Sequence, residues 1–188
     1  MSGCNLAAVE IFCGPGGLSL GLERAGFTVV ASVDNDLHVE STYLRNSHHH
    51  KKAQFIRADI GQLSGRDLLR QVGLGRSDVD LIAGGPPCKG FSSANLKTRN
   101  GDNPHNKLVD HFFRIVTEIR PKLFLMENVM GLIWFADEFL RSGNYFSKLE
   151  SLGYETQLNR INALDYGVPQ NRQRLLIVGK RVKALVTS

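Results

Sequence analysis

Short runs of apolar and β-branched residues alternate along the chain with segments of helical spacing. Five runs have the length of buried strands, namely Ala7–Phe12, Thr28–Val33, Gln54–Ala58, Val79–Ala83 and Leu123–Met126. Strands that alternate with helices are the repeat from which parallel sheets are built. We therefore predict an α/β protein with a mostly parallel sheet.

Apolar residues three or four positions apart predict helices between these strands. One helix runs from Leu18 toward Gly26, a glycine that can end it. A longer stripe from Leu108 to Ile119 stops before Pro121, and a short helix follows from Tyr145 to Leu152. These segments supply the crossovers that a parallel sheet requires.

The pattern changes near the end of the sequence. Glu155–Ile161 and Arg174–Gly179 are two strands with no room between them for a crossover helix. We expect them to pair antiparallel at one edge of the sheet. The longest loop is predicted from Ser92 to Asn106, a length that is often functional.

The composition is that of one globular domain over residues 1–188, with 42% hydrophobic and 22% charged residues. No apolar run approaches the roughly 20 residues that cross a bilayer, and Met1–Glu10 lacks a basic leader followed by an apolar segment. We expect a cytoplasmic protein. The net charge of +5 permits a nucleic-acid partner without requiring one.

A glycine-rich turn, Cys13-Gly14-Pro15-Gly16-Gly17, connects the first strand to a helix. Glycines let backbone N–H groups approach a ligand at a helix start, although such a turn can also be a tight connection and nothing more. A nicotinamide or flavin fingerprint would need glycine at position 19, where the chain has Ser19, and no phosphate-binding Gly-Lys-Ser/Thr follows.

Acidic residues follow the next two strands. Asp34 comes at the end of the second strand and Asp59 at the end of the third. One acid at a strand end is usually a helix cap, but two beside a glycine turn favour an adenosine cofactor whose ribose hydroxyls an acid can bind.

Cys88 lies in the segment Gly84–Ser92, directly after the fourth strand and behind two prolines. Ligand crevices form at the carboxyl ends of parallel strands, so this thiol is a candidate nucleophile. Burial as a structural thiol is the alternative, and it is the role we expect for Cys4 and Cys13.

Two further charged groups are predicted near that edge. Glu127 follows the fifth strand and can donate a proton to a ring nitrogen. Arg172 and Arg174 are two positions apart at the start of a strand and therefore point the same way. A surface charge pair is the other interpretation of the arginines.

The order and spacing of these motifs resemble the cytosine-C5 DNA methyltransferases. The resemblance runs from about Ala7 to Gly179, and its most specific part is Pro86-Pro87-Cys88 together with Glu127-Asn128-Val129. It implies a Rossmann-like methyltransferase fold that binds S-adenosylmethionine, of the kind found in restriction-modification systems. The residues implied around the cofactor are Phe12, Gly14, Pro15, Gly17, Asp34, Asn35, Asp59, Ile60, Gly85, Pro87 and Leu108.

The chemistry that follows begins with Cys88, which would add to carbon 6 of cytosine and make carbon 5 nucleophilic. Glu127 would hydrogen-bond or protonate ring nitrogen 3, and Arg174, helped by Arg172, would hold the carbonyl oxygen. The base must be flipped out of the duplex to reach these groups.

Two features depart from the family. Lys89 stands where glutamine is usual, and a cation there could lower the pKa of Cys88 or disturb contacts with the flipped base. The target-recognition region and final segment expected after the Gln170-x-Arg172-x-Arg174 strand are missing before Ser188. We therefore expect a second chain to carry the target-recognition region, with truncation or an inactive remnant as alternatives.

Two other functions stay open, an RNA cytosine-C5 methyltransferase and a non-catalytic binding or regulatory module. A metal site at His48-His49-His50 is not expected, because three adjacent histidines cannot all face one ion.

Overall fold

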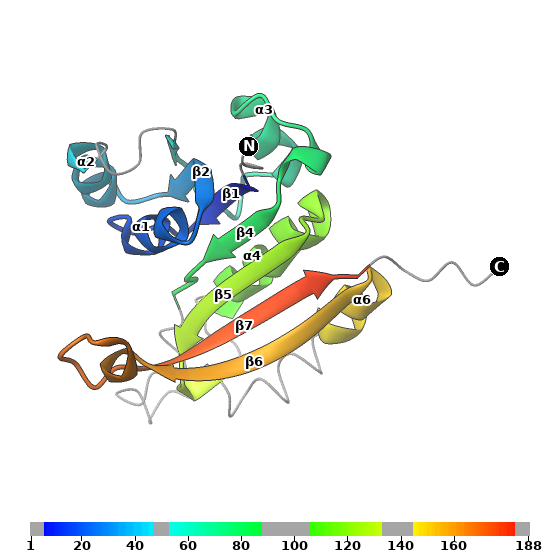
Figure 1. The fold of residues 1–188 in the computed structure, drawn as a ribbon. Coiled ribbons are helices and arrows are strands. Elements are labelled where there is room, and N and C mark those ends of the chain that lie inside the picture. The colour runs from blue at the N-terminus through cyan, green and yellow to red at the C-terminus, as the bar shows by residue number, and fades with distance from the viewer. Residues whose placement is uncertain (1–5, 47–52, 88–105, 133–144, 183–188) are drawn as a thin grey trace, which may run out of the picture.

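The computed structural model describes residues 6–46, 53–87, 106–132 and 145–182, which form one seven-stranded sheet with helices on both faces. The strands lie in the order β3-β2-β1-β4-β5-β7-β6, which Figure 1 shows from β2 to β6. The strands are β1 (Leu6–Ile11), β2 (Phe27–Asp34), β3 (Gln54–Arg57), β4 (Leu81–Gly84), β5 (Leu123–Val129), β6 (Tyr154–Asn162) and β7 (Gln173–Arg181). The helices are α1 (Gly17–Arg24), α2 (Leu37–Arg45), α3 (Gly65–Gln71), α4 (Asn106–Ile119) and α6 (Tyr145–Ser151), with 3-10 turns η2 (Arg76–Asp78) and η6 (Ala163–Tyr166).

The five strands predicted from apolar runs pair in parallel. Every residue of β4 is buried, as expected of a central strand covered on both faces. β7 then pairs antiparallel with both β5 and β6. The predicted mostly parallel sheet with an antiparallel edge hairpin is therefore confirmed.

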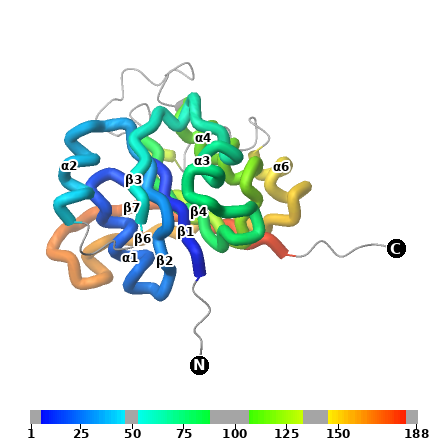
Figure 2. Tube along the Cα trace, turned by 90° about the horizontal axis from the view of Figure 1, so that it is seen from above, coloured from blue at the N-terminus to red at the C-terminus, as the bar shows by residue number. Residues whose placement is uncertain are grey.

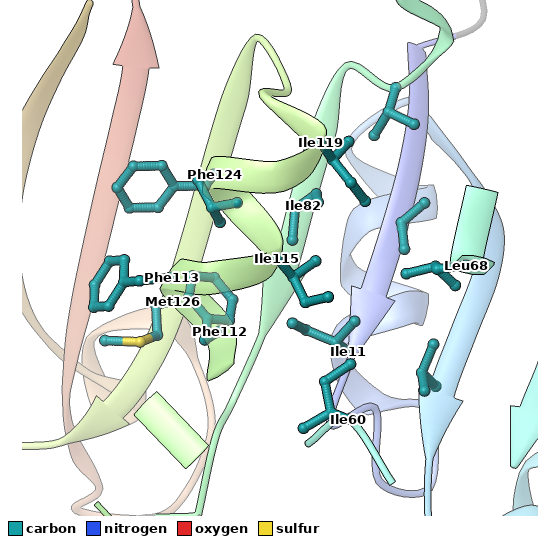
Figure 3. Close-up of a cluster of buried hydrophobic side chains, with 14 of the residues drawn as sticks. Ile11, Ile60, Leu68, Ile82, Phe112, Phe113, Ile115, Ile119, Phe124 and Met126 are labelled. Atoms are coloured by element: carbon teal, nitrogen blue, oxygen red, sulfur yellow. The ribbon is translucent and has the colours of Figure 1, made fainter. Parts of the chain in front are cut away.

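Helices cover the two faces of the sheet unequally. Figure 2 shows α1 and α2 on one side of the strands and α3, α4 and α6 on the other. The larger core lies on the α3, α4 and α6 side, where Phe112, Ile115 and Ile119 of α4 are fully buried against the strands (Figure 3). A smaller cluster on the other face packs Leu22 of α1 against Ala8 and Val29.

The side chains of β1 point alternately to the two faces of the sheet. Val9 and Ile11 belong to the larger core, whereas Ala8 points into the smaller cluster with α1. Because side chains alternate between the faces of a strand, Glu10 shares the α1 face with Ala8. Glu10 is 1% exposed, so this face holds a buried carboxyl group near the carboxyl end of β1.

The carboxyl ends of β1, β2, β3 and β4 meet at one edge of the sheet, since these strands run parallel. The predicted helices begin and end within a few residues of their expected limits, and α4 begins at Asn106, the last residue of the predicted loop. The rest of the loop from Ser92 and the histidines from His48 to His50 lie outside the described residues. Within the described part of the chain, no helix is long and apolar enough to cross a membrane.

Candidate cofactor and catalytic site

The glycine turn leaves β1 in a conformation that ordinary residues rarely adopt. Phe12, Gly14 and Gly16 have φ values of 57°, 52° and 97°. Glycine adopts this left-handed region without steric cost, whereas at Phe12 the surrounding structure must hold the backbone there. The turn directs the chain into α1, which begins at Gly17.

Asp34, the last residue of β2, holds this turn from the side. Its Oδ2 accepts a hydrogen bond from the N–H of Gly14 at 3.0 Å, and its Oδ1 accepts from the N–H of Asp36 at 3.1 Å. The carboxylate therefore links the loop after β1 to the loop after β2. Each carboxylate oxygen has a second lone pair, so Asp34 can still accept hydrogen bonds from a ligand.

A cleft of about 240 Å³ opens beside this carboxylate at the carboxyl edge of the sheet. Nine of the eleven residues predicted around the cofactor line it, whereas Pro15 and Gly17 do not. The lining consists of Phe12, Gly14, Val33, Asp34, Asn35, Ala58, Asp59, Ile60, Gly85, Pro87 and Leu108. Val33 and Ala58 were missed in the sequence, where they are simply apolar residues beside the two acids.

The lining combines apolar surfaces with a few polar groups at one end. Phe12, Ile60 and Leu108 provide apolar walls on which an adenine ring can pack, and Asp34 provides acceptors for ribose hydroxyls. Asp59 is partly committed, because its Oδ1 accepts from the N–H of Gly61 at 2.8 Å. The residues present therefore fit an adenosine-containing cofactor.

The segment that leads to Cys88 is held at the same edge. Asn128, which is 3% exposed, donates from Nδ2 to the carbonyl oxygen of Pro86 at 3.1 Å. Pro87 lines the cleft and is the last described residue before Cys88. Cys88 itself lies outside the described residues.

Glu127 and Arg174 form an ion pair next to this segment. Arg174 Nε lies 2.7 Å from Glu127 Oε1, and the two side chains are 20% and 36% exposed. Their strands pair with Arg174 opposite Val129. A Cβ atom placed on Gly85 would lie 3.3 Å from Oε2 of Glu127, so the cysteine segment passes close to this carboxylate.

Arg172 lies one residue before the strand that contains Arg174. β7 begins at Gln173, so Arg172 precedes the strand and its side chain is exposed. Its backbone N–H donates to Oδ1 of Asn162 at 3.0 Å. Its carbonyl oxygen accepts from the N–H of Ala163 at 3.0 Å, and the common direction of the Arg172 and Arg174 side chains stays a prediction.

Cys13 is buried, as predicted for a structural thiol. Burial, with smaller contributions from Glu10 and Asp34, raises the pKa of its thiol far above the ordinary range. A thiol that stays protonated is a poor nucleophile. Cys4 and Cys88 lie outside the described residues, within which no cluster of metal-binding side chains occurs.

Sequence reasoning missed two groups that the structure brings to the site. Asn128 was noted only as part of a motif, and its side-chain bond to the Pro86 carbonyl needed the fold to be seen. The second group joins Glu10, Ser19, Ser32 and Tyr43 beneath the glycine turn. The acid at position 10 interrupts an apolar strand, which was the one signal available in the sequence.

The chain is similar to a known protein family. The family model described as C-5 cytosine-specific DNA methylase matches residues 6–187. Type II methyltransferase M.XorII from Xanthomonas oryzae pv. oryzae is 38% identical over 177 residues, which cover 92% of this chain and 40% of that protein. Type II methyltransferase M.AquIA from Picosynechococcus is 34% identical, with 93% of this chain and 71% of that protein covered.

A solved structure agrees with the sequence relatives. The crystal structure of a putative prophage-encoded DNA modification methyltransferase from Escherichia coli superposes with a TM-score of 0.80 at 32% identity. The match covers 94% of this chain and 47% of that protein. The chain thus spans less than half the length of this structure and of M.XorII.

Proposed function

Because the chain belongs to the family of C-5 cytosine-specific DNA methylases, we propose that it methylates carbon 5 of a cytosine in DNA. The main support for the proposal is that a cleft suited to adenosine and an ion pair suited to cytosine lie at the same edge of the sheet. A cleft suited to adenosine ends at Pro87, and the pair of Glu127 with Arg174 lies against Gly85. A methyl donor and a cytosine held there would both be close to Gly85 and Pro87, in the segment that precedes Cys88 in the sequence.

The cleft residues hold S-adenosylmethionine, the methyl donor of this family. Asp34 accepts hydrogen bonds from the ribose, and Phe12, Ile60 and Leu108 enclose the adenine, while Asn35, Asp59, Gly14, Gly85 and Pro87 complete the cleft. Pro15 and Gly17 contribute through the shape of the turn. This cofactor supplies a methyl group that is ready for transfer to a nucleophilic carbon.

Cys88 provides the nucleophile that activates the base. Its thiolate adds to carbon 6 of the cytosine ring. The π electrons of the carbon 5–carbon 6 double bond shift through the ring toward nitrogen 3. After carbon 5 has gained the methyl group, loss of its proton returns an electron pair to the ring. The carbon 5–carbon 6 double bond re-forms as the bond between carbon 6 and the sulfur breaks, and Cys88 leaves as a thiolate.

Glu127 and Arg174 stabilise the charge that this addition creates. Glu127 hydrogen-bonds or protonates ring nitrogen 3, and Arg174 donates to the carbonyl oxygen of the base. Their contact of 2.7 Å supports this assignment, because it brings an acid and a cation to the same small region. Arg172, which is exposed immediately before β7, assists Arg174 in holding this oxygen.

Access to carbon 6 requires that the cytosine leave the duplex, which costs a few kcal/mol. The net charge of +5 supports contacts with phosphates that offset this cost. We further propose that a second chain provides target recognition. It is tested by adding a chain that carries a target-recognition region.

A methyl-transfer assay tests the proposal as a whole. The protein is incubated with methyl-labelled S-adenosylmethionine and either DNA or RNA, with and without the neighbouring gene product, and nucleosides are identified by mass spectrometry. The expected product is 5-methylcytosine in DNA, absent with Cys88→Ser. Label in RNA alone, at another atom of DNA, or at an equal rate with Cys88→Ser would overturn the proposal.

A further inference from the structure

A buried polar cluster lies beneath the glycine turn and takes no part in the chemistry described above. It consists of Glu10 of β1, Ser19 of α1, Ser32 of β2 and Tyr43 of α2. All four residues are 1% exposed or less. Burying so many polar groups costs free energy unless they hydrogen-bond to one another. The connections among these four side chains therefore decide this cost.

Hydrogen bonds connect the four elements through this cluster. The Ser19 hydroxyl donates to Glu10 Oε2 and lies 3.2 Å from the Tyr43 hydroxyl, which in turn lies 2.7 Å from the Ser32 hydroxyl. The strand before the glycine turn is thereby tied to the helix after it.

The start of α1 depends on this connection. Its N-cap, Gly16, makes no side-chain cap, and its first turn contains no acidic residue. The first N–H groups of a helix need acceptors from elsewhere. In the first turn of α1, the hydroxyl of Ser19 donates to Oε2 of Glu10 and so ties this turn to β1.

The second oxygen of Glu10 has a different environment. Oε1 is buried without a hydrogen-bond partner among the described residues. The titratable groups that face Glu10 are Asp34, Cys13 and Tyr43, and none of these is a cation. An ionised carboxylate in such surroundings is strongly disfavoured, so a neutral carboxylic acid suits the site. Burial correspondingly raises the pKa of Glu10 to about 8.

We propose that Glu10 is a positioning residue for the cofactor, acting through Ser19 to hold the glycine turn and Gly14 against Asp34. The inference rests on the proposed function of the cleft. Glu10 does not itself line the cleft, whereas Gly14 and Asp34 do. Loss of the Glu10 contact frees the start of α1, which moves the turn and weakens cofactor binding.

Calorimetry with S-adenosylhomocysteine, the stable demethylated form of the cofactor, tests the proposal. Glu10→Gln keeps a neutral hydrogen-bonding group and should bind within about twofold of the parent at pH 7. Glu10→Leu and Ser19→Ala should bind about tenfold more weakly. Glu155→Gln, an exposed change on β6, is the matched control and should have no effect.

A pH series from 6 to 9 separates positioning from a merely structural role. The parent protein should lose affinity above pH 8, as Glu10 ionises, relative to Glu10→Gln, which has no proton to lose at this position. Circular dichroism of each variant establishes that it is folded, and the Glu10→Gln profile remains informative if Glu10→Leu is not.

Two results would contradict the inference alone. One is a folded Glu10→Leu protein that binds within twofold of the parent, and the other is an identical pH profile for the parent and Glu10→Gln. Absence of any binding by the parent protein is a separate outcome. It would overturn the proposed cofactor cleft, and the positioning role with it.

Discussion

Asp34 shows how one side chain can serve both the fold and the site. Its carboxylate accepts backbone N–H groups from the loops after β1 and β2, and it also lines the cleft. The sequence predicted the acid at the end of a strand and a ribose role for it. The bond to Gly14 could not be predicted, because it depends on how closely two loops approach.

Replacement of Asp34 separates charge from hydrogen bonding. Asp34→Ala should weaken cofactor binding by about 1 to 3 kcal/mol, since charge-assisted hydrogen bonds to the ribose are lost. Asp34→Asn should lose less, because the amide oxygen can still accept. Calorimetric affinities equal to that of the parent for both variants would place the ribose elsewhere.

The Glu127 and Arg174 pair should affect chemistry and leave cofactor binding unchanged. Removing one group that stabilises developing charge costs about 10² to 10³ in turnover. We expect Glu127→Gln and Arg174→Gln each to fall in this range while binding S-adenosylhomocysteine normally. Arg160→Gln, an exposed change on β6, is the control. A turnover within threefold of the parent for both pair variants would remove them from the mechanism.

Elements were predicted best where the pattern was strongest. The sequence predicts β4, β5 and α4 clearly. Burial on one or both faces requires apolar residues at regular positions in these elements. α2 and α3 are short helices whose limits depend on capping side chains, Asp36 and Ser64. Such caps are common polar residues, so the sequence alone did not define these two helices.

The Ser64 cap provides a test at the scale of one helix. Its side chain accepts from the N–H of Asp67 at 3.1 Å, and its hydroxyl donates to the Asp67 carboxylate at 2.7 Å. Ser64→Ala should lower the free energy of unfolding by about 1 kcal/mol in urea titrations. Ser41→Ala, an exposed change within α2, should leave it nearly unchanged. Equal stabilities for the two variants would show that Ser64 does not cap α3.

At the scale of the whole molecule, the sequence indicated a parallel sheet with an antiparallel edge but not the order of its strands. That order places β1 between β2 and β4, and so brings the glycine turn, Asp34 and Pro87 to one cleft. Strand order follows from long-range packing, which local periodicity does not contain. The buried cluster around Glu10 could not be predicted from the sequence for the same reason.

Glu10 also predicts how global stability varies with pH. Burial raises its pKa in the folded state from 4.5 to about 8, so the folded protein holds this proton more tightly than the unfolded chain. The resulting stabilisation is complete below about pH 4.5 and is lost as pH rises through about 8.

Urea unfolding of the parent protein and of Glu10→Gln between pH 5 and pH 9 measures this dependence. The stability of the parent relative to the variant should fall across the range by an amount on the order of a few kcal/mol. A constant or rising difference would show that Glu10 is ionised in the folded protein at neutral pH.

The central claim is that Cys88 bonds covalently to a cytosine held beside the cleft, and trapping tests it most directly. In DNA that contains 5-fluorocytosine, addition of the thiolate and methylation of carbon 5 can proceed, but fluorine cannot leave as a proton does. The account predicts a stable complex that requires S-adenosylmethionine, with the added mass on the peptide containing Cys88 and no complex for Cys88→Ser. Formation of 5-methylcytosine in ordinary DNA without a trapped complex, or a complex that survives Cys88→Ser, would contradict it.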